Sequence, residues 1–554
     1  MNRRHFLQLT GTTTAALFFR NLTFAQGKNS IINIPDEVWA KSGAEWYRLT
    51  RSGEAYTYKD IAVTLTPVTG ALSVKVQSPT LPLNAVKLQW KHSFSPGTKC
   101  LVDHWERSYG DIGWLAPVAD KKMPWYFIQH DEGNSAACFG VKTGCSTICH
   151  WALTPGNLEF VMDTRCGGAG VQLGNRQLHA ADIVVTNSRN GETLFAAAQR
   201  FCGLMCRVPR LPKQPVYGIN DWYFAYGNNS YDLIVEHTSL MADLVTNHDN
   251  KPFSVVDAGW AQYSPYFPGD GGWNEDFSKP NDKFKDMHKM ADAIKNLGMR
   301  PGLWTRPLCG RHDEKPSVCL PLIPGRNNPK APVLDPSIDD NLARVHYNIA
   351  TYKQWGYHLV KHDYSTYDMM GKWGMQMQDD ITTPGWRFKD TSKTTAEITL
   401  KLYSTIRDAA EDMYIIGCNT FSHLSAGIFE MCRIGDDTSG KEWARTKKMG
   451  VNTMGFRITQ HNHFYAVDGD CVGLTKDIPW SKNKQWMQLL AESSAPLFIS
   501  AQPDALGAEQ KDFIKLSFAN AAKKQPVGEP LDWLDNEWPA KWRLNGREVG
   551  FDWS

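Results

Sequence analysis

The sequence predicts a multidomain α/β protein in which a (β/α)8 TIM barrel follows an N-terminal antiparallel β-sandwich and precedes a short C-terminal β segment. The chain has 554 residues, too many for one small core, so two or three domains are expected. Between about residues 30 and 205, short alternating runs lie between turn signals, which is typical of an antiparallel sandwich. After Pro215, strand-like runs alternate with helical ones, which predicts a parallel sheet.

The domain boundaries follow changes in composition along the chain. The segment VPRLPKQP, with three prolines in eight residues, is typical of a linker between domains. The tail, GEPLDWLDNEWPAKWRLNGREVGFDWS, indicates a few β-strands. The expected units are an export signal over residues 1–26, the sandwich over 27–210, the barrel over 211–525 and the C-terminal β segment over 526–554.

The parallel sheet is predicted from about eight strand candidates. They are VYGIND, FSVVDAGW, RPGLW, YHLVKHD and MYIIGCN, continuing through GIFEMCRIG, GVNTMGFRITQ, HFYAVDGD and APLFIS. Eight is the number of strands that a (β/α)8 barrel requires. An open doubly wound sheet is the alternative, but no strand is followed by the glycine-rich phosphate loop of that fold.

The N-terminus, MNRRHFLQLTGTTTAALFFRNLTFAQ, has the pattern of a twin-arginine export signal. Arg3 and Arg4 precede a weakly apolar run, and residues 23–25 offer a small-residue cleavage site. The alternative is a surface segment that is not an export signal. No later window is apolar for long enough to span a bilayer, so we predict a soluble mature protein that is periplasmic or secreted.

The composition excludes some partners and favours others. The net charge of +2 gives no indication of a nucleic acid or an acidic partner. The chain has 21 Trp, 19 Tyr and 24 Phe, and tryptophan at this density exceeds what core packing usually needs. Flat aromatic rings can serve as platforms for the C–H faces of sugars, although an aromatic-rich core is the alternative interpretation.

Metal sites are only weakly indicated. His461-Asn462-His463 would place two imidazoles on one face of a strand, as in a metal site, but no third ligand is placed nearby. The 12 cysteines permit disulfides in an exported protein without indicating their pairing, and none forms the paired C-x-x-C pattern of structural zinc. We therefore predict no metal and no cofactor.

The chemistry of a (β/α)8 barrel lies at the C-terminal ends of its strands. Here these positions are rich in carboxylates and tryptophan and hold no serine nucleophile elbow. Glycoside hydrolysis needs two carboxylates that face one pocket: one attacks the anomeric carbon, and the other protonates the leaving oxygen and later deprotonates water. The residues at the strand ends are Asn220, Asp221, Trp222, Asp257, Trp260, Trp304, Arg306, Lys361, Asp363, Cys418, Asn419, Arg433, Asp436, Asp437, Asp468 and Asp470.

The stretch GYHLVKHDYSTYD ends a buried strand with Lys361 and Asp363. A strand has period two, so these two side chains project to the same side. A cation there keeps the neighbouring aspartate ionised and can donate hydrogen bonds to sugar hydroxyls. A surface ion pair is the alternative, but the position at the end of the fourth barrel strand favours a functional pair.

Eight stretches occur in the order of a known family over residues 215–505: NDWYFAYG, VVDAGW, RPGLWTRPL, LVKHDYS, GCNTFSH, CRIGDDTSG, FYAVDGDC and APLFIS. On these motifs the barrel resembles glycoside hydrolase family 36, the melibiase or α-galactosidase family, whose clan includes families 27 and 31. The resemblance implies a retaining mechanism on an α-linked sugar, with Asp363 as the nucleophile. It also implies that Lys361 binds a hydroxyl group, that Cys418 lies near the sugar 2-hydroxyl and that Arg433 precedes the acid/base residue.

The resemblance leaves two candidates for the acid/base. Counting four residues from Arg433, as relatives with an R-x-x-x-D pattern suggest, gives Asp437, whereas alignment on an S-D-N-T pattern gives Asp436. We favour Asp437 and expect the acid to occupy the drier position, because desolvation raises the pKa of a carboxyl group toward neutrality. The predicted substrate-binding residues are Asp221, Trp222, Asp257, Trp260, Trp304, Lys361, Cys418 and Arg433.

One departure from the family concerns the substrate. Galactosidases of this clan commonly carry two adjacent acids after the second strand, which hold the 4- and 6-hydroxyls, and here Asp257 is followed by Ala258. The eighth strand also has Ala501-Gln502 where relatives often carry an acid. A galacto-configured sugar is the first expectation, and an arabinopyranose, which lacks the C6 arm, is the second.

The predicted function is that of a retaining α-glycosidase, with a carbohydrate as its partner and an oligomeric state that the sequence does not indicate. The alternatives are a β-L-arabinopyranosidase or transglycosidase with the same carboxylates, a non-catalytic carbohydrate-binding barrel and a metal-dependent hydrolase centred on His461 and His463. The sandwich segment HWERSYGDIGW holds Trp105, Tyr109 and Trp114, which either border the sugar pocket or pack at a domain interface.

Overall fold

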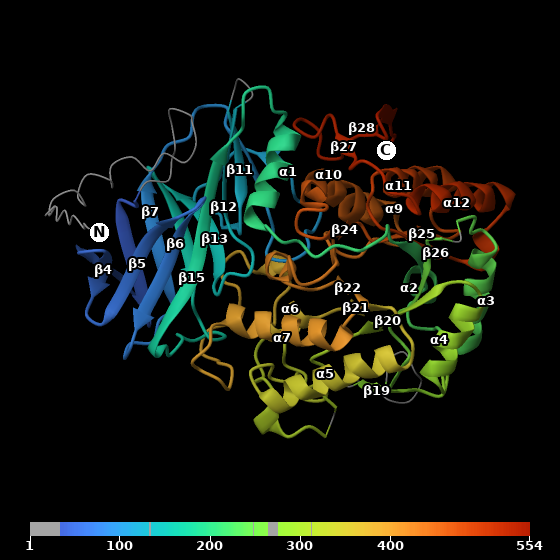
Figure 1. The fold of residues 1–554 in the computed structure, drawn as a ribbon, viewed down its shortest axis with the longest axis horizontal. Coiled ribbons are helices and arrows are strands. Elements are labelled where there is room, and N and C mark those ends of the chain that lie inside the picture. The colour runs from blue at the N-terminus through green and yellow to red at the C-terminus, as the bar shows by residue number, and fades with distance from the viewer. Residues whose placement is uncertain (1–33, 132–134, 248, 264–274, 312) are drawn as a thin grey trace, which may run out of the picture.

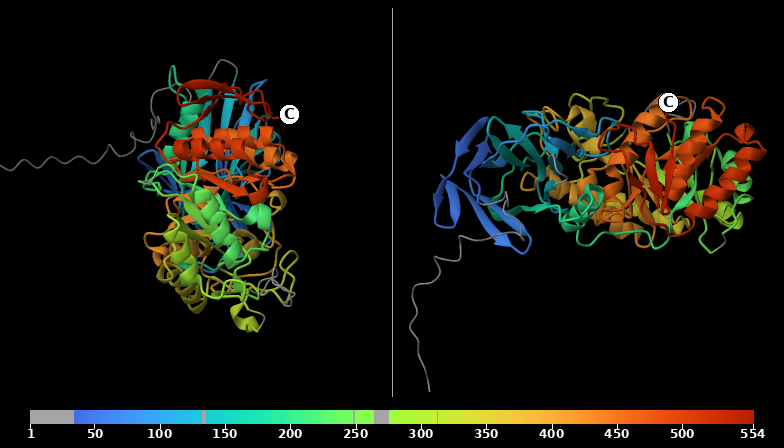
Figure 2. Two further views of the ribbon diagram at one scale, coloured as in Figure 1. Left: turned by 90° about the vertical axis from the view of Figure 1, so that its right-hand side faces the viewer. Right: turned by 90° about the horizontal axis from the view of Figure 1, so that it is seen from above.

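The computed structural model describes residues 34–131, 135–247, 249–263, 275–311 and 313–554. The expected export signal over residues 1–26 lies outside the described residues. Figures 1 and 2 show antiparallel sheets at one end of an elongated molecule and a helix-covered parallel sheet at the other.

Two antiparallel sheets form the N-terminal part of the chain. Their strand orders are β10-β13-β14-β7-β1-β2 and β3-β4-β5-β6-β15-β12-β11-β8-β9. The first comprises β1 (Glu37–Ser42), β2 (Glu45–Arg48), β7 (Ala85–Lys91), β10 (Met123–Pro124), β13 (Ile148–Thr154) and β14 (Asn157–Asp163). The second comprises β3 (Thr50–Ser52), β4 (Ala55–Tyr58), β5 (Ile61–Val68), β6 (Ala71–Ser78), β8 (Lys99–Val102), β9 (Trp114–Leu115), β11 (Phe127–Asp131), β12 (Ser135–Val141) and β15 (Gly174–Asn187).

Aromatic side chains from both sheets pack between them. The ring centroids of Phe127 and Phe139, in the nine-stranded sheet, lie 4.7 Å apart. Those of Trp151 and Phe160, in the six-stranded sheet, lie 4.6 Å apart. Phe139 and Trp151 connect the two pairs at 5.7 Å, so the sheets meet face to face through these rings. Part of the aromatic content therefore fills a core, as the alternative interpretation held.

The second half of the chain forms a parallel sheet in the order β24-β23-β22-β21-β20-β17-β16-β26-β25. The end strands β24 and β25 are separated only by Gly469 and Asp470, so they act as one interrupted strand. Counted that way, the order of eight strands returns to its starting point. The strands are β16 (Tyr217–Asn220), β17 (Phe253–Val256), β20 (Arg300–Thr305), β21 (Leu359–His362), β22 (Tyr414–Gly417), β23 (Met431–Arg433), β24 (Ala466–Asp468), β25 (Cys471–Leu474) and β26 (Leu497–Ala501).

Helices connect successive parallel strands and lie around the sheet (Figure 1). The α-helices are α1 (Leu194–Met205), α2 (Trp222–Ala225), α3 (Tyr231–Ala242), α4 (Met287–Asn296), α5 (Asp339–Gln354), α6 (Ser365–Met370), α7 (Thr395–Ala410), α8 (Ser422–Ser425), α9 (Trp443–Thr446), α10 (Thr453–Arg457), α11 (Trp480–Glu492) and α12 (Ala508–Ala521). Shorter elements are η2 (Pro316–Val318), η3 (Gly374–Gln376), η4 (Lys447–Asn452), η5 (Ile458–Gln460), η6 (Pro503–Ala505), β18 (Ala261–Gln262) and β19 (Asp276–Pro280).

The stretch GVNTMGFRITQ was predicted as a strand, and this prediction was wrong. It folds as the end of η4 followed by α10 and η5. Val451, Met454 and Ile458 are fully buried and recur at helical spacing, which is how a run rich in β-branched residues can bury one face of a helix.

The C-terminal residues form a three-stranded antiparallel sheet, as predicted for the tail. Its strands are β27 (Glu529–Pro530), β28 (Lys541–Leu544) and β29 (Arg547–Gly550). Beside it, Trp533 packs against Trp114 of the N-terminal sheets, with centroids 5.3 Å apart, and against Phe456 of α10 at 6.3 Å. Trp114 therefore packs between domains and does not border a sugar pocket.

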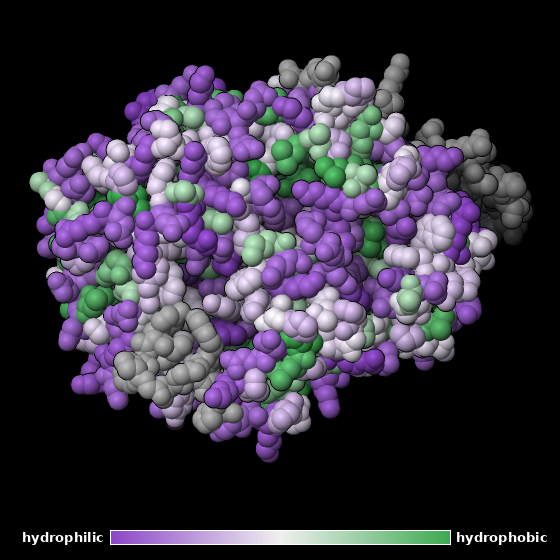
Figure 3. All heavy atoms as spheres, turned by 180° about the vertical axis from the view of Figure 1, so that it is seen from behind, coloured by the Kyte–Doolittle hydropathy of each residue, from purple (hydrophilic) through white to green (hydrophobic). Residues whose placement is uncertain are grey.

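One face of the molecule is largely polar. Figure 3 shows a face dominated by hydrophilic residues, with hydrophobic ones in small separate patches. Within the described ranges, no helix is both long and apolar enough to cross a membrane. All twelve cysteines lie in the described part of the chain, and all are free thiols.

Candidate active site

The polar residues at the strand ends continue the inward-facing rows of the barrel. Leu359, Ile416 and Met431 belong to one buried cluster formed mainly by strand residues. Side chains alternate along a strand, so Lys361, Cys418 and Arg433, each two residues further on, face the same interior. The apolar rows therefore fill the barrel and place charged groups at its carboxyl end.

Residues at this end of the barrel line two adjoining hollows, which we call the inner and outer compartments. Both are lined by Asp363, Tyr364 and Asp437, which therefore mark their boundary. The inner compartment is also lined by Trp222, Asp257, Ala258, Trp304 and Lys361. The outer compartment is also lined by Arg107, Tyr109, Trp373, Met375 and Asp436.

Both carboxylate oxygens of Asp363 are held by hydrogen bonds. The indole Nε1 of Trp304 donates to Oδ2 at 3.2 Å, and the backbone N–H of Tyr364 donates to Oδ1 at 2.8 Å. Tyr364 has a φ of 67°, so the chain turns sharply directly after the carboxylate. These contacts orient a half-buried carboxylate toward the pocket.

Lys361 pairs with Asp257, not with Asp363 as the sequence spacing suggested. Its Nζ donates to Oδ2 of Asp257 at 2.7 Å, and Nδ2 of Asn220 donates to the same oxygen at 2.7 Å. Burial disfavours the charge of Lys361, but the carboxylate of Asp257 outweighs it and holds the pKa of Lys361 well above its ordinary value. Lys361 and Asp363 both line the inner compartment, but the ion pair of Lys361 is with Asp257.

Asp221 lies behind the inner compartment. Its Oδ1 accepts from the backbone N–H of Asp257 at 2.8 Å, and its Oδ2 accepts from Nδ2 of Asn229 at 2.7 Å. Burial, followed by the charge of Asp257, raises the pKa of Asp221 to about 7. Asp221 is therefore placed to support Asp257 rather than to line the pocket.

Asp436 and Asp437 occupy different surroundings. Asp436 is gripped from two sides, by Arg107 at 2.8 Å and Arg445 at 2.9 Å. Asp437 contacts Nη2 of Arg433 at 3.2 Å and lines both compartments. The side chain of Asp437 is 39% exposed and that of Asp436 16%, so the favoured acid is not in the drier position as expected.

We expected burial to raise the pKa of the acid/base residue, but the pKa of Asp437 is not raised. Although burial favours its neutral form, the surrounding cations, Arg433 first and Arg107 next, hold the pKa of Asp437 below its ordinary value. Arg433 is fully buried and donates to Asp470 at 2.8 Å, which fixes the guanidinium beneath Asp437. Arg433 therefore acts on Asp437 from behind, without lining the pocket.

Cys418 and Trp260 are also buried behind the pocket. Cys418 accepts a long contact of 3.9 Å from Nη1 of Arg107, and burial raises the pKa of its thiol. The indole N–H of Trp260 donates to the backbone oxygen of Trp304 at 2.9 Å. Trp260 is fully buried, so it supports Trp304 and does not itself form the predicted sugar platform.

Sequence reasoning missed the contribution of Arg107, Trp373 and Met375 to the outer compartment. The guanidinium of Arg107 lies 5.2 Å from the ring centre of Trp373. Tyr367 stacks on Trp373 with centroids 4.3 Å apart, and the ring of Tyr364 lies 5.7 Å away. These residues come from segments between strands, where no periodicity marks them. The motif HWERSYGDIGW was the available signal, because it contains Arg107 among its aromatic residues.

The loop after β8 is joined to the barrel through Glu106. Its Oε1 accepts from the backbone N–H of Gly374 at 2.7 Å, and its carboxylate also accepts from Tyr109 and Asn419. Tyr109 lines the outer compartment, as one interpretation held, whereas Trp105 is buried against Trp125.

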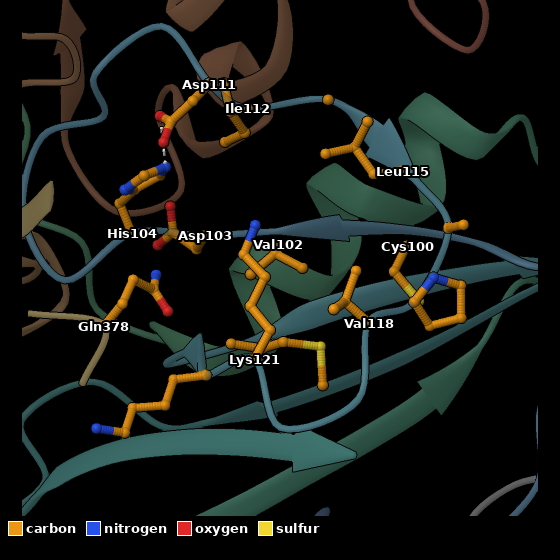
Figure 4. A pocket seen from close by; sticks show the side chains of 15 residues that line it. Cys100, Val102, Asp103, His104, Asp111, Ile112, Leu115, Val118, Lys121 and Gln378 are labelled. Atoms are coloured by element: carbon orange, nitrogen blue, oxygen red, sulfur yellow. Dashed lines mark ion pairs between the residues drawn. The ribbon is translucent and has the colours of Figure 1, made fainter. Parts of the chain in front are cut away.

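Another hollow lies among the N-terminal sheets and contains none of the predicted site residues. Figure 4 shows Asp103, His104 and Asp111 on one side of it and Leu115 and Val118 on the other. His104 and Asp111 form an ion pair of 3.1 Å there. Its acidic side chains are thus not arranged as two carboxylates flanking a bond, and this hollow is not the candidate active site.

The two histidines proposed for a metal do not share a strand face. Nδ1 of His461 accepts from the backbone N–H of Val467 at 3.1 Å, and its Nε2 lies 3.3 Å from Ser494. His463 lies beside Gly203 of α1 instead. Across the described residues, no cluster of three or more His, Cys, Asp or Glu side chains could hold a metal ion.

The parallel strands thus carry two pocket-facing carboxylates, Asp363 and Asp437, at their carboxyl ends. The fold is similar to that of solved α-galactosidases, among them members of glycoside hydrolase family 36. No protein-family model matches the sequence.

TtGalA, an α-galactosidase from Thermus thermophilus in complex with p-nitrophenyl α-D-galactopyranoside, is 16% identical at a TM-score of 0.60; the match covers 93% of this chain and 98% of TtGalA. The family 36 α-galactosidase AgaA from Geobacillus stearothermophilus is 12% identical at a TM-score of 0.58, over 87% of this chain and 71% of AgaA. The galactosidase domain of AgaSK is 14% identical at a TM-score of 0.59, over 84% and 67% of the two chains.

Proposed function

We propose that this protein is a retaining α-glycosidase for α-linked, galacto-configured sugars, with Asp363 as nucleophile and Asp437 as acid/base. The observation that carries the proposal is the shared position of the two carboxylates on the boundary between the inner and outer compartments. A glycosidic bond that lies across this boundary would have one carboxylate for attack and one for proton transfer.

The two compartments suit the two sides of such a bond. The inner one offers Asp257, Lys361 and the indole of Trp304, which supply acceptors, donors and an apolar face for one sugar ring. The outer one is lined largely by residues from segments between strands, and it would take the leaving group. The complexes of similar α-galactosidases with stachyose and raffinose support a galactoside as the substrate.

Two related activities are the alternatives. A transglycosidase would use the same carboxylates with a sugar hydroxyl replacing water, and a β-L-arabinopyranosidase would need no group for the C6 arm. A non-catalytic carbohydrate-binding barrel is not favoured, because Asp363 and Asp437 both line the pocket. A metal-dependent hydrolase is not favoured either, because the contacts of His461 and His463 diverge.

The substrate is tested first on the wild type with aryl α-D-galactoside, α-D-glucoside, α-N-acetylgalactosaminide and β-L-arabinopyranoside. Galactose and L-arabinopyranose share their ring hydroxyl pattern and differ in the C6 arm. Ala258 lines the inner compartment and offers no acceptor for that arm, so the arabinoside should match or exceed the galactoside in kcat/KM. Ala258→Asp should shift the preference toward galactose by about tenfold or more.

Ala258→Asn is the matched control, because it adds similar bulk without a charged acceptor. A wild type that strongly prefers galactose, together with an Ala258→Asp variant that is only impaired, would show that another residue holds the C6 hydroxyl. Cleavage of none of the four glycosides would contradict the proposed function itself.

We also propose that the protein is exported to the periplasm or secreted. Arg3 and Arg4 before an apolar run support a twin-arginine route. Replacing both with lysine should retain the full chain in the cytoplasm, as measured by cell fractionation and immunoblotting. Unchanged distribution of the double variant would overturn the proposal.

A further inference from the structure

We propose that Arg107, from the N-terminal sheets, is a positioning residue of the barrel's proton-transfer site: it fixes Asp436 and sets how readily Asp437 releases its proton. The inference rests on the proposed function, because it gives the proton transfer to Asp437. It assigns part of the active site to a domain that contributes neither of the two carboxylates.

The backbone around Arg107 is fastened to the segment that carries both aspartates. The N–H of Ser108 donates to the oxygen of Ile434 at 2.8 Å, and the N–H of Asp436 donates to the oxygen of Ser108 at 2.9 Å. This two-bond bridge places Ser108 beside Gly435, the residue that precedes Asp436. Backbone hydrogen bonds therefore fix the position of one segment relative to the other.

A buried guanidinium reinforces the bridge. Nη1 of Arg457 donates to the backbone oxygens of both Glu106 and Ile434 at 2.9 Å each. Its Nε lies 3.0 Å from Asp103, which balances the charge. Arg107 is thus held between two anchored neighbours, Glu106 and Ser108.

The anchored backbone directs the Arg107 side chain onto the acid/base site. Its Nη2 lies 2.8 Å from Asp436, and its Nη1 lies 3.8 Å from Asp437. Trp373 packs beside the guanidinium, and only 7% of the Arg107 side chain is exposed. A charge shielded from water in this way acts more strongly on a carboxylate than a solvated one does.

Asp437 is surrounded by several charged or titratable groups. They are Arg433 from β23, Arg107 from the loop after β8, Lys361 and Asp363 from β21 and its end, Arg445 from α9, Asp436 next to it in the chain, and Tyr223 and Tyr226 from α2 and its end. Together the cations hold the pKa of Asp437 below its ordinary value. Losing Arg107 removes one cation and leaves Asp436 less compensated, and both changes make Asp437 harder to ionise.

The first test compares Arg107→Gln with Arg445→Gln. The substrate is an unactivated galactoside such as raffinose, whose leaving group needs a proton, so kcat/KM falls with rising pH as the general acid ionises. We expect Arg107→Gln to move this alkaline limb upward by about one pH unit. Arg445→Gln should move it less, because Arg445 is 39% exposed and contacts only Asp436. Arg107→Lys, which keeps the charge, should restore most of the wild-type limb.

The second test needs no substrate and separates this inference from the proposed function. Asp437→Cys places a thiol in an open pocket, whereas the native cysteines are buried or, for Cys319, half-buried. The pH dependence of iodoacetamide labelling reports the pKa of the introduced thiol. Adding Arg107→Gln should raise it by about one unit, and adding Arg445→Gln should raise it less.

The inference would be overturned if Arg107→Gln shifted neither the alkaline limb of the kcat/KM profile nor the pKa of the introduced thiol. A fall in kcat alone would not support it, because a merely structural role lowers activity without shifting either quantity. If no glycoside is cleaved, the thiol titration still tests whether Arg107 lowers the pKa of a group at position 437. If Arg107→Gln does not fold, as judged by circular dichroism, Arg107→Met is used in both tests, since its unbranched chain keeps packing against Trp373 without the charge.

Discussion

Asp363→Ala should lower kcat on an aryl α-galactoside by at least about 10⁴-fold while the fold persists. The carboxylate sits on the boundary of the two compartments, and its hydrogen bonds come from Trp304 and from the next backbone N–H. Its loss therefore removes the attacking group without opening a cavity in the core. Added azide should enter the space of the missing carboxylate and form a β-configured glycosyl azide, since a single displacement inverts the anomeric carbon.

Asp363→Asn is the isosteric control for this prediction. It keeps the shape of the side chain but has one acceptor oxygen where Asp363 has two, so it keeps only one of the two hydrogen bonds. It should also be inactive but should not release room for azide. Thermal unfolding of both variants within a few degrees of the wild type would show that the fold is kept. Near-normal turnover by Asp363→Ala would reject the nucleophile assignment.

The overall fold was predictable because the period of the hydrophobic residues and the turn residues between elements both indicate secondary structure. Alternation predicted the antiparallel strands, and strand–helix alternation predicted the parallel sheet, whose fourth strand ends at Lys361 and Asp363 as expected. The error at residues 450–460 came from reading β-branched residues as a strand, although Val451, Met454 and Ile458 keep a helical spacing. In that segment the spacing of the apolar residues was better evidence for the secondary structure than the content of β-branched residues.

The site was predictable only where strand geometry fixes it. Inward-facing positions follow from period two, so Asp257, Lys361 and Asp363 could be placed from sequence. Their partners could not, because the Lys361–Asp257 pair joins different strands across the barrel interior. Arg107 lies 329 positions before Asp436 in the numbering, and contacts over such separations leave no local pattern.

Our proposal of Asp437 rather than Asp436 as the acid/base draws on the structure as well as on the sequence. Sequence alignment allowed both, and the expectation of a drier acid pointed to the wrong physical difference. Both aspartates lie near two arginines, but the two arginine contacts of Asp436 are shorter than 3 Å. Asp437 lines both compartments, whereas Asp436 lines only the outer one. An acid/base must reach the glycosidic oxygen and then a water molecule, so our proposal of Asp437 is based on its access to the pocket and not on its burial.

Asp437→Ala should slow turnover of an unactivated galactoside such as raffinose by about 10²- to 10⁴-fold. An aryl galactoside with a good leaving group should lose much less in kcat/KM, because its departure needs little protonation. The covalent intermediate should then accumulate, since water attack lacks its base. Azide needs no base, so it should restore turnover and yield an α-configured glycosyl azide after two inversions.

Asp436→Ala is the matched control, one residue away and with the same change in charge. Its carboxylate is engaged with Arg107 and Arg445, so its loss should alter the two substrates alike and azide should not restore activity. The anomeric configuration of the azide product, read by NMR, separates the roles: β from Asp363→Ala, α from Asp437→Ala and none from Asp436→Ala. An α-azide from Asp436→Ala and none from Asp437→Ala would reverse the assignment, and Asp437 would then be a binding group held by Arg433.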